Sequence, residues 1–155
     1  MKKEFMNRAI QLSEQGMKNN KGGPFGCVIV KDGAIIAEGN NSVTSQNDPT
    51  AHAEVVAIRR ACEALGDFQL TGCELYTSCE PCPMCLGAIY WARPDRVYYA
   101  AKREDAADAG FDDEFIYKEL NIPPMKRKIP MESLGRNQAI EVFKQWKKKD
   151  DKIEY

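Results

Sequence analysis

The chain has 155 residues, of which 43% are hydrophobic and 29% charged, and its formal net charge is −1. These values are typical of a soluble globular protein, and we expect residues 1–155 to form a single domain. The near-zero charge argues against a general affinity for nucleic acid or anionic membranes. The N-terminal sequence lacks a secretory signal, and no apolar run reaches the length of a membrane span, so we expect a cytoplasmic protein.

Hydrophobic periodicity predicts helices that alternate with strands after one hairpin. An Asp-Gly pair at 32–33 predicts the hairpin turn, and Thr50 is expected to cap the second helix. In chain order, the predicted elements are a helix over 3–20, strands over 27–30 and 34–38, a helix over 51–65, a strand over 73–77, a helix over 81–91, a strand over 97–101, helical pieces within 104–121, a short strand over 126–131 and a C-terminal helix around 140–146. This order predicts an α/β fold, a three-layer α/β/α sandwich with a mixed sheet of about five strands.

The six cysteines do not suggest disulfides. Three of them follow one another at every third residue, which is too close for a disulfide framework, and the other three lie in apolar stretches. The three closely spaced cysteines are Cys79, Cys82 and Cys85. Without an export signal, this pattern favours thiol or metal chemistry in a reducing cytoplasm.

Two short motifs carry the candidate chemistry: His52-Ala53-Glu54 and, further on, Pro81-Cys82-Pro83-Met84-Cys85. Cys82 and Cys85 are three residues apart, so on the first turn of a helix both sulfurs face the same side. Unpaired N–H groups and the positive dipole end of that helix favour thiolates. Zinc binds thiolate and imidazole in a tetrahedron, and His52 is the only histidine. These three residues therefore predict a zinc site whose fourth position is open to water.

Glu54 favours a catalytic zinc over a structural one. Zinc-activated water needs a base to accept its proton, and a carboxylate can pass that proton on to a substrate nitrogen and then to a departing amine. Two alternatives stay open at this point. Cys79 as a fourth ligand would close a structural Cys3His site, and Glu54 would then be an ordinary solvated helix residue. The three cysteines also have iron–sulfur spacing, but the expected fourth cysteine is missing.

The H-x-E and P-C-x-x-C motifs resemble the cytidine-deaminase-like superfamily of zinc deaminases. The resemblance covers nearly the whole chain and looks like the small bacterial guanine deaminases, above all in the segments 22–26, 48–54 and 82–93. It implies a cytidine-deaminase-like fold. It also implies one Zn²⁺ per subunit, with a bound water, held by His52, Cys82 and Cys85, while Glu54 transfers protons.

The same resemblance implies residues that bind the substrate. Asn41 would hydrogen-bond a purine ring and Phe25 would pack against it. In isolation, these two residues would be interpreted as a turn asparagine and a core phenylalanine. Ala53 and Trp91, within the matching segments, would complete the pocket.

The segment 110–119 resembles the guanine deaminases specifically. There, Asp113 would act as a second proton shuttle at the leaving amino group, and Tyr155 would help to close the pocket. The resemblance further implies a homodimer with exchanged C-terminal segments, so that Asp113 and Tyr155 serve the partner's pocket. In isolation, an acidic cluster is usually solvated and a terminal residue usually frayed.

The expected reaction is hydrolytic deamination of guanine to xanthine and ammonia. The alternatives are a tRNA adenosine deaminase, another nucleobase deaminase acting on cytosine, a purine or a pterin, and a non-enzymatic structural-zinc protein. The net charge of −1 and the acidic stretch 104–119 argue against a tRNA substrate, and the lysines of 144–149 are interpreted as a solvated helix face. We therefore expect a small purine base as the partner, and neither nucleic acid nor membrane.

Overall fold

The computed structural model describes residues 2–155, and the contacts within the chain divide it into two compact units. The first unit ends at Asp113, and the second is Glu114–Tyr155. Among the described residues, no helix is both long and apolar enough to cross a membrane.

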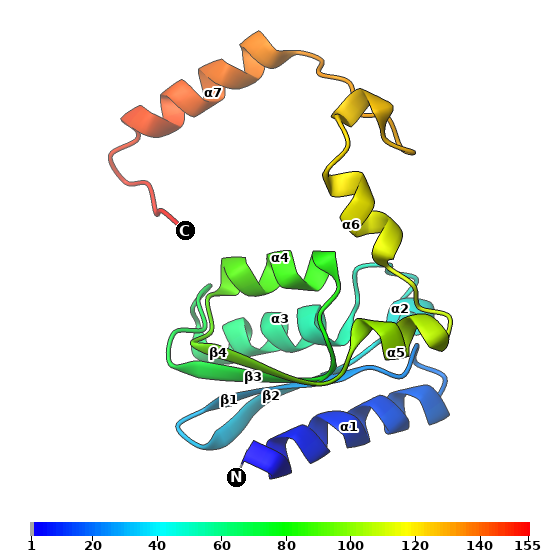
Figure 1. Ribbon diagram of the computed structural model, residues 1–155. Coiled ribbons are helices and arrows are strands. Elements are labelled where there is room, and N and C mark those ends of the chain that lie inside the picture. Colours follow the sequence, from blue (N-terminus) through cyan, green and yellow to red (C-terminus); the bar gives the residue numbers. More distant parts are fainter. Residues whose placement is uncertain (1) are drawn as a thin grey trace. The chain divides into compact units, whose positions relative to one another are not determined.

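The first unit holds one mixed sheet covered by helices on both faces (Figure 1). Its elements are α1 (Lys2–Lys18), β1 (Gly26–Lys31), β2 (Ala34–Asn40), α2 (Val43–Gln46), α3 (Ala53–Leu65), β3 (Cys73–Cys79), α4 (Pro83–Ala92), β4 (Arg96–Ala101) and α5 (Arg103–Asp108). The strand order is β2-β1-β3-β4, and of the paired strands β3 and β4 run parallel. Helix α1 covers one face, whereas α3 and α4 cover the other. The predicted three-layer α/β/α sandwich is therefore confirmed.

The side chains of β3 alternate between the two faces of the sheet, as the pleat of a strand requires. Leu75 is fully buried in the core beneath α3 and α4. Tyr76 points to the other face, where its ring lies 5.4 Å from that of Phe5 in α1. Thr77 follows Leu75 on the α3 side, because residues two apart on a strand share a face.

The predicted hairpin turn and the predicted end of the helix over 51–65 are confirmed by backbone conformation. Asp32 and Gly33 have φ values of 51° and 76°, as the two-residue turn of a β-hairpin requires. Gly66 has a φ of 63° and caps the C-terminus of α3. Both positions were recognisable because a left-handed backbone strongly favours glycine or a small polar residue.

Strand β2 approaches the start of α3 so closely at Gly39 that no side chain fits there. A Cβ atom on Gly39 would lie 2.3 Å from the carbonyl oxygen of Ala53 and 2.7 Å from the backbone nitrogen of Ala57. Both atoms belong to the helix backbone, which cannot move aside without shifting α3. This contact fixes the height of the first turn of α3 above the sheet.

We expect Gly39→Ala to lower the free energy of unfolding by about 1–3 kcal/mol, because the added methyl group overpacks a helix–sheet contact. Gly87→Ala is the matched control, since its Cβ would meet no atom within 4 Å in the interior of α4. It should be neutral or raise stability by up to about 1 kcal/mol. Urea denaturation of both variants measures the difference, and equal midpoints would contradict the packing argument.

The second unit contains three helical segments: α6 (Glu114–Leu120), the 3₁₀ helix η1 (Pro124–Lys126) and α7 (Arg136–Lys148). The C-terminal helix was predicted, but the strand over 126–131 is wrong, so the sheet has four strands rather than about five. The backbone donors of this segment are used locally. Lys128 donates its N–H to a Glu119 carboxylate oxygen at 2.7 Å, and Met131 donates its own to the Pro124 carbonyl at 3.1 Å.

Candidate metal centre and active site

A cavity of about 300 Å³ lies in the first unit, at the edge of the sheet where β2 and β3 end and α3 and α4 begin. Its lining residues are Gly23, Phe25, Asn41, Val43, Thr44, His52, Glu54, Cys79, Glu80, Cys82, Arg103, Ala106, Phe111 and Asp113. The N-termini of two helices therefore meet at one cavity. Such ends carry unpaired N–H groups and favour anionic ligands and thiolates.

His52, Cys82 and Cys85 form a group at one wall of this cavity that could hold a metal ion. Their ligand atoms all lie within 4.8 Å of one another. His52 Nδ1 is 3.5 Å from the sulfur of Cys82 and 3.5 Å from the sulfur of Cys85. The nitrogen that faces both sulfurs is therefore Nδ1.

These distances fit a tetrahedral zinc ion. With Zn–S bonds of about 2.3 Å and Zn–N bonds of about 2.0–2.1 Å, tetrahedral angles place sulfur and nitrogen about 3.5 Å apart. Both observed separations agree with that value. One imidazole and two thiolates also leave one of four positions open, as in catalytic zinc sites. The residues present therefore fit the ion that the sequence predicted.

The local fold explains why the two cysteines face the histidine. Cys82 is the N-cap of α4, Pro83 occupies the first turn, and the Cys85 N–H points at the Cys82 sulfur over 3.5 Å. Hydrogen bonds from the Cys85 thiol and from His52 lower the pKa of Cys82 to about 4. The pKa of Cys85 is raised, first by the hydrogen bond between its thiol and Cys82 and then by its burial. A metal ion would take the place of the proton between them, since metal binding releases protons from thiols.

Cys79 does not belong to this group among the residues that the structure describes. Its thiol is oriented toward the carbonyl oxygen of Lys102, 3.7 Å away, although the residue lines the same cavity. Burial and the nearby charge of Glu54 raise the pKa of the Cys79 thiol to about 11. This geometry disfavours the closed Cys3His site.

Glu54 lies in the first turn of α3 and is 6% exposed, yet it lines the cavity. One carboxylate oxygen, Oε1, accepts a hydrogen bond from the Thr77 hydroxyl at 3.0 Å. The other, Oε2, lies 3.3 Å from the Cys85 sulfur. Burial raises the pKa of Glu54, and the hydrogen bonds oppose this shift. A buried carboxylate beside a metal group can exchange protons there, and this one is not a solvated helix residue.

Asn41 lies immediately after β2 and is 6% exposed. Its side-chain oxygen accepts hydrogen bonds from the backbone N–H groups of Gly23 and Val43, both at 3.2 Å. These two donors fix the orientation of the amide, because its NH₂ group could not accept them. The NH₂ group is therefore the part of Asn41 that remains available to a ligand in the cavity.

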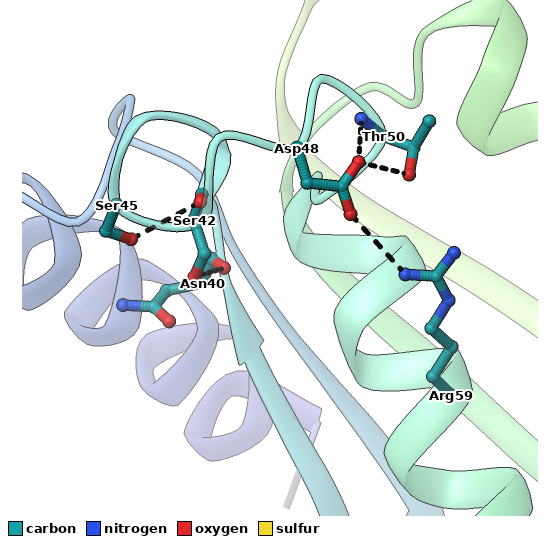
Figure 2. A network of polar contacts seen from close by, with 6 residues as sticks. All are labelled: Asn40, Ser42, Ser45, Asp48, Thr50 and Arg59. Carbon is teal, nitrogen blue, oxygen red and sulfur yellow. Dashed lines mark hydrogen bonds and ion pairs between the residues drawn. The ribbon is translucent and has the colours of Figure 1, made fainter.

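The loop between β2 and α3 carries both Asn41 and His52, and its own polar contacts hold it (Figure 2). Asp48 accepts the N–H and the hydroxyl of Thr50 at 2.8 and 2.7 Å and pairs with Arg59 of α3 at 3.8 Å. The predicted N-cap at Thr50 is wrong, because Asp48 engages that side chain. The N-cap of α3 is His52.

Asp113 lies at the end of the first unit and lines the cavity of its own chain, whereas the resemblance implied that it serves the partner's pocket. Burial raises the pKa of its carboxyl group, and the negative charge of Cys82 adds to this effect, whereas Arg103 opposes it. Phe25 also lines the cavity, and its ring packs edge-on against Phe111 with the ring centroids 5.0 Å apart. A second acid–base group and an apolar wall thus share the cavity with the metal group.

The structure leaves the predicted binding roles of three residues untested. The side chain of Ala53 is buried in the core, and Trp91, on α4, is 63% exposed. Tyr155 belongs to the second unit. Their roles in binding stay predictions. Conversely, no sequence motif points to Thr77, Glu80 or Arg103, whose contacts depend on how distant elements pack.

Comparison with known proteins agrees with this geometry. Residues 1–101 match the family described as the cytidine and deoxycytidylate deaminase zinc-binding region. The guanine deaminase of Bacillus subtilis (strain 168) is 60% identical over 151 residues, which are 97% of this chain and 97% of that protein. An X-ray structure of guanine deaminase from Bacillus subtilis superposes with a TM-score of 0.96 at 59% identity and covers 99% of this chain and 98% of its own.

Two further relatives are more distant. The crystal structure of a mutant protein in complex with 8-azaguanine has a TM-score of 0.68 at 33% identity and covers 70% of this chain and 63% of its own. A tRNA-specific adenosine deaminase from Aquifex aeolicus (strain VF5) is 34% identical over 148 residues, 96% of this chain and 95% of that protein. The family match spans the sheet, the helix that carries the histidine and the helix that carries both cysteines. The chain therefore belongs to the zinc-binding cytidine and deoxycytidylate deaminase family.

Proposed function

We propose that the chain catalyses the hydrolytic deamination of guanine to xanthine and ammonia. The observation that carries the proposal is that a zinc-fitting group, a buried glutamate, an oriented amide and a second carboxylate line one cavity of about 300 Å³. Identity of 60% to a guanine deaminase over nearly the full chain supports guanine as the substrate. The 34% identity to a tRNA-specific adenosine deaminase gives less support to a tRNA substrate.

His52, Cys82 and Cys85 are the residues that would hold the zinc ion. When bound, zinc lowers the pKa of a coordinated water and so supplies the nucleophile for attack at C2 of guanine. Glu54 accepts the proton that this water loses and delivers it to N3 of the ring. Its burial supports this role, because burial raises the pKa of Glu54 and so makes its carboxylate a stronger proton acceptor.

Asp113 assists departure of the amine. The C2 amino group must gain a proton before it leaves as ammonia, and the second proton of the water is the one available. Glu54 and Asp113 pass it from the hydroxyl group at C2 to the amine, which leaves a carbonyl at C2 of xanthine. The raised pKa of the Asp113 carboxyl supports this assignment, since burial favours the protonated form, which is the form that can donate.

Asn41 orients the base, and Phe25 packs against it. With its oxygen held by two backbone donors, Asn41 offers its NH₂ group to an acceptor on the purine. Guanine carries such acceptors at N7 and O6. Phe25, held by Phe111, gives the base an apolar surface to stack on. Ala53, Trp91 and Tyr155 complete the proposed pocket.

Asn41→Asp should raise the KM for guanine about tenfold or more and lower kcat less. The carboxylate keeps an oxygen for the donors of Gly23 and Val43 but replaces the NH₂ donor with a second acceptor, which repels acceptors on the base. Steady-state ammonia release measures both constants. An unchanged KM would remove Asn41 from substrate binding.

We further infer that residues 1–155 function as a single deaminase domain in a homodimer, with the C-terminal segment exchanged between subunits. The second unit supports this inference, because large apolar side chains are exposed on it, among them Leu134 at 96% and Phe143 at 68%. We place the enzyme in the cytoplasm, and six free cysteines support a reducing compartment. Light scattering after gel filtration measures the oligomeric state, and a monomeric mass would refute the dimer.

A substrate panel tests the proposed function. Purified zinc-loaded protein is incubated separately with guanine, adenine, cytosine, guanosine, a pterin and a tRNA that carries a wobble adenosine, and ammonia is measured in each case. We expect release from guanine with the highest kcat/KM. Ammonia release from the tRNA alone would show that the cavity deaminates adenosine in tRNA. Ammonia release from none of these substrates would support a structural role for the zinc.

A further inference from the structure

The carboxylate of Glu54 is held on one oxygen by a side chain that lies outside both sequence motifs. The Thr77 hydroxyl donates to Oε1 over 3.0 Å. Thr77 is 1% exposed and Glu54 is 6% exposed, so water does not compete for this hydrogen bond. A buried hydrogen bond to a charged oxygen is among the stronger ones in proteins.

Thr77 is itself rigidly placed. It lies in β3, opposite Cys27 of β1 on one side and Tyr99 of β4 on the other. Its β-branched side chain has few accessible rotamers in a strand. The hydroxyl therefore comes from the centre of the sheet, whereas Glu54 lies on the first turn of the helix above it.

The second oxygen of Glu54 has a different environment. Oε2 lies 3.3 Å from the sulfur of Cys85, and in the metal-free chain that thiol can donate to it. A cysteine that binds zinc is a thiolate and has no proton to donate. Of the two side chains Thr77 and Cys85, only Thr77 can then donate a hydrogen bond to the Glu54 carboxylate in the zinc-loaded protein.

We propose that Thr77 is a positioning residue that fixes Oε1 of Glu54 and so holds the other oxygen, Oε2, toward the metal group. This inference rests on the proposed deamination. A hydroxyl suits the task, because it supplies one uncharged donor and orients the carboxylate without neutralising it as a lysine would. Without the hydrogen bond, the carboxylate can rotate and meets the reacting atoms in fewer productive orientations.

Thr77→Val tests the proposal, because valine keeps the shape of threonine and lacks the hydroxyl. We expect kcat to fall about 10- to 100-fold and KM to stay within about threefold. Thr77→Ser restores the donor and should recover kcat to within about threefold of the wild type. If Thr77→Val does not fold, Thr77→Ala takes its place, and the expected order of kcat remains threonine and serine well above alanine.

Three measurements separate positioning from a general structural effect. Zinc per chain, the melting temperature and the affinity for xanthine by calorimetry should differ little between Thr77→Ser and the folded variant without the hydroxyl. In a Glu54→Gln background, Thr77→Val should cause no further loss of activity, because both changes disable the same carboxylate. An equal further loss in that background would show that Thr77 acts independently of Glu54.

Failure of this inference differs from failure of the proposed function. The variants are assayed with the base on which the wild-type protein is most active. A wild type inactive on guanine but active on another base refutes the proposed substrate and leaves the Thr77 comparison intact. An unchanged kcat in Thr77→Val, or a loss that Thr77→Ser does not recover, overturns the role of Thr77.

Discussion

Glu54→Gln should lower kcat for guanine by about 10²–10⁴-fold while zinc stays bound. Glutamine keeps the size of the side chain, and its carbonyl oxygen can still accept from Thr77. It cannot accept the proton of the attacking water or pass one to N3. The proposed zinc ligands, His52, Cys82 and Cys85, are untouched. Ammonia release and metal analysis on the same preparation measure both quantities.

Glu80→Gln is the matched control for that experiment. Glu80 also lines the cavity, and its carboxylate accepts the backbone N–H of Arg103 at 3.3 Å. It shares no hydrogen bond with the metal group, so its loss should change kcat much less than the loss of Glu54. Full activity in Glu54→Gln, or equal losses in the two variants, would contradict the role given to Glu54.

Cys82→Ser should abolish zinc binding and with it nearly all activity. Serine has a neutral hydroxyl in place of a thiolate, and zinc binds such an oxygen poorly. Because the ion stabilises the folded chain by binding to it, the melting temperature should also fall, and added zinc should not restore it. Metal analysis after dialysis, with a parallel thermal melt, checks both effects.

Cys79→Ser provides the matched control, since the same substitution is made three residues earlier in the wall of the same cavity. Cys79 lies outside the ligand group, so this variant should keep one zinc per chain and most of its activity. Loss of zinc in Cys79→Ser would instead support the closed Cys3His site. The pair of variants therefore decides between an open and a closed metal centre.

The features that were predicted correctly depend on short stretches of sequence. Cys82 and Cys85 face one side because they begin the same helix, and Gly33 and Gly66 mark turns because their backbone is left-handed. The metal group follows once two such helix ends meet at the edge of the sheet. Pattern alone could therefore predict the three-layer fold and the group of His52, Cys82 and Cys85 that could hold a metal ion.

The features that were missed depend on contacts between residues that compete or lie far apart. Asp48 engages Thr50, so the cap of α3 moves to His52. The hydrogen bond of Thr77 to Glu54 requires the register of β3 and the height of α3, neither of which is local. Such contacts follow from packing. No sequence pattern distinguishes a threonine that makes such a contact from any other buried threonine in a strand.

The central claim is that this metal group and Glu54 add water to the amino-bearing carbon of a purine. Guanine incubated with zinc-loaded protein in ¹⁸O-enriched water, followed by mass spectrometry, tests it most directly. We expect equimolar ammonia and xanthine that carries one ¹⁸O atom, and neither product from Glu54→Gln in the same time. Absence of labelled xanthine from the wild-type protein, with one zinc bound per chain, would contradict the account.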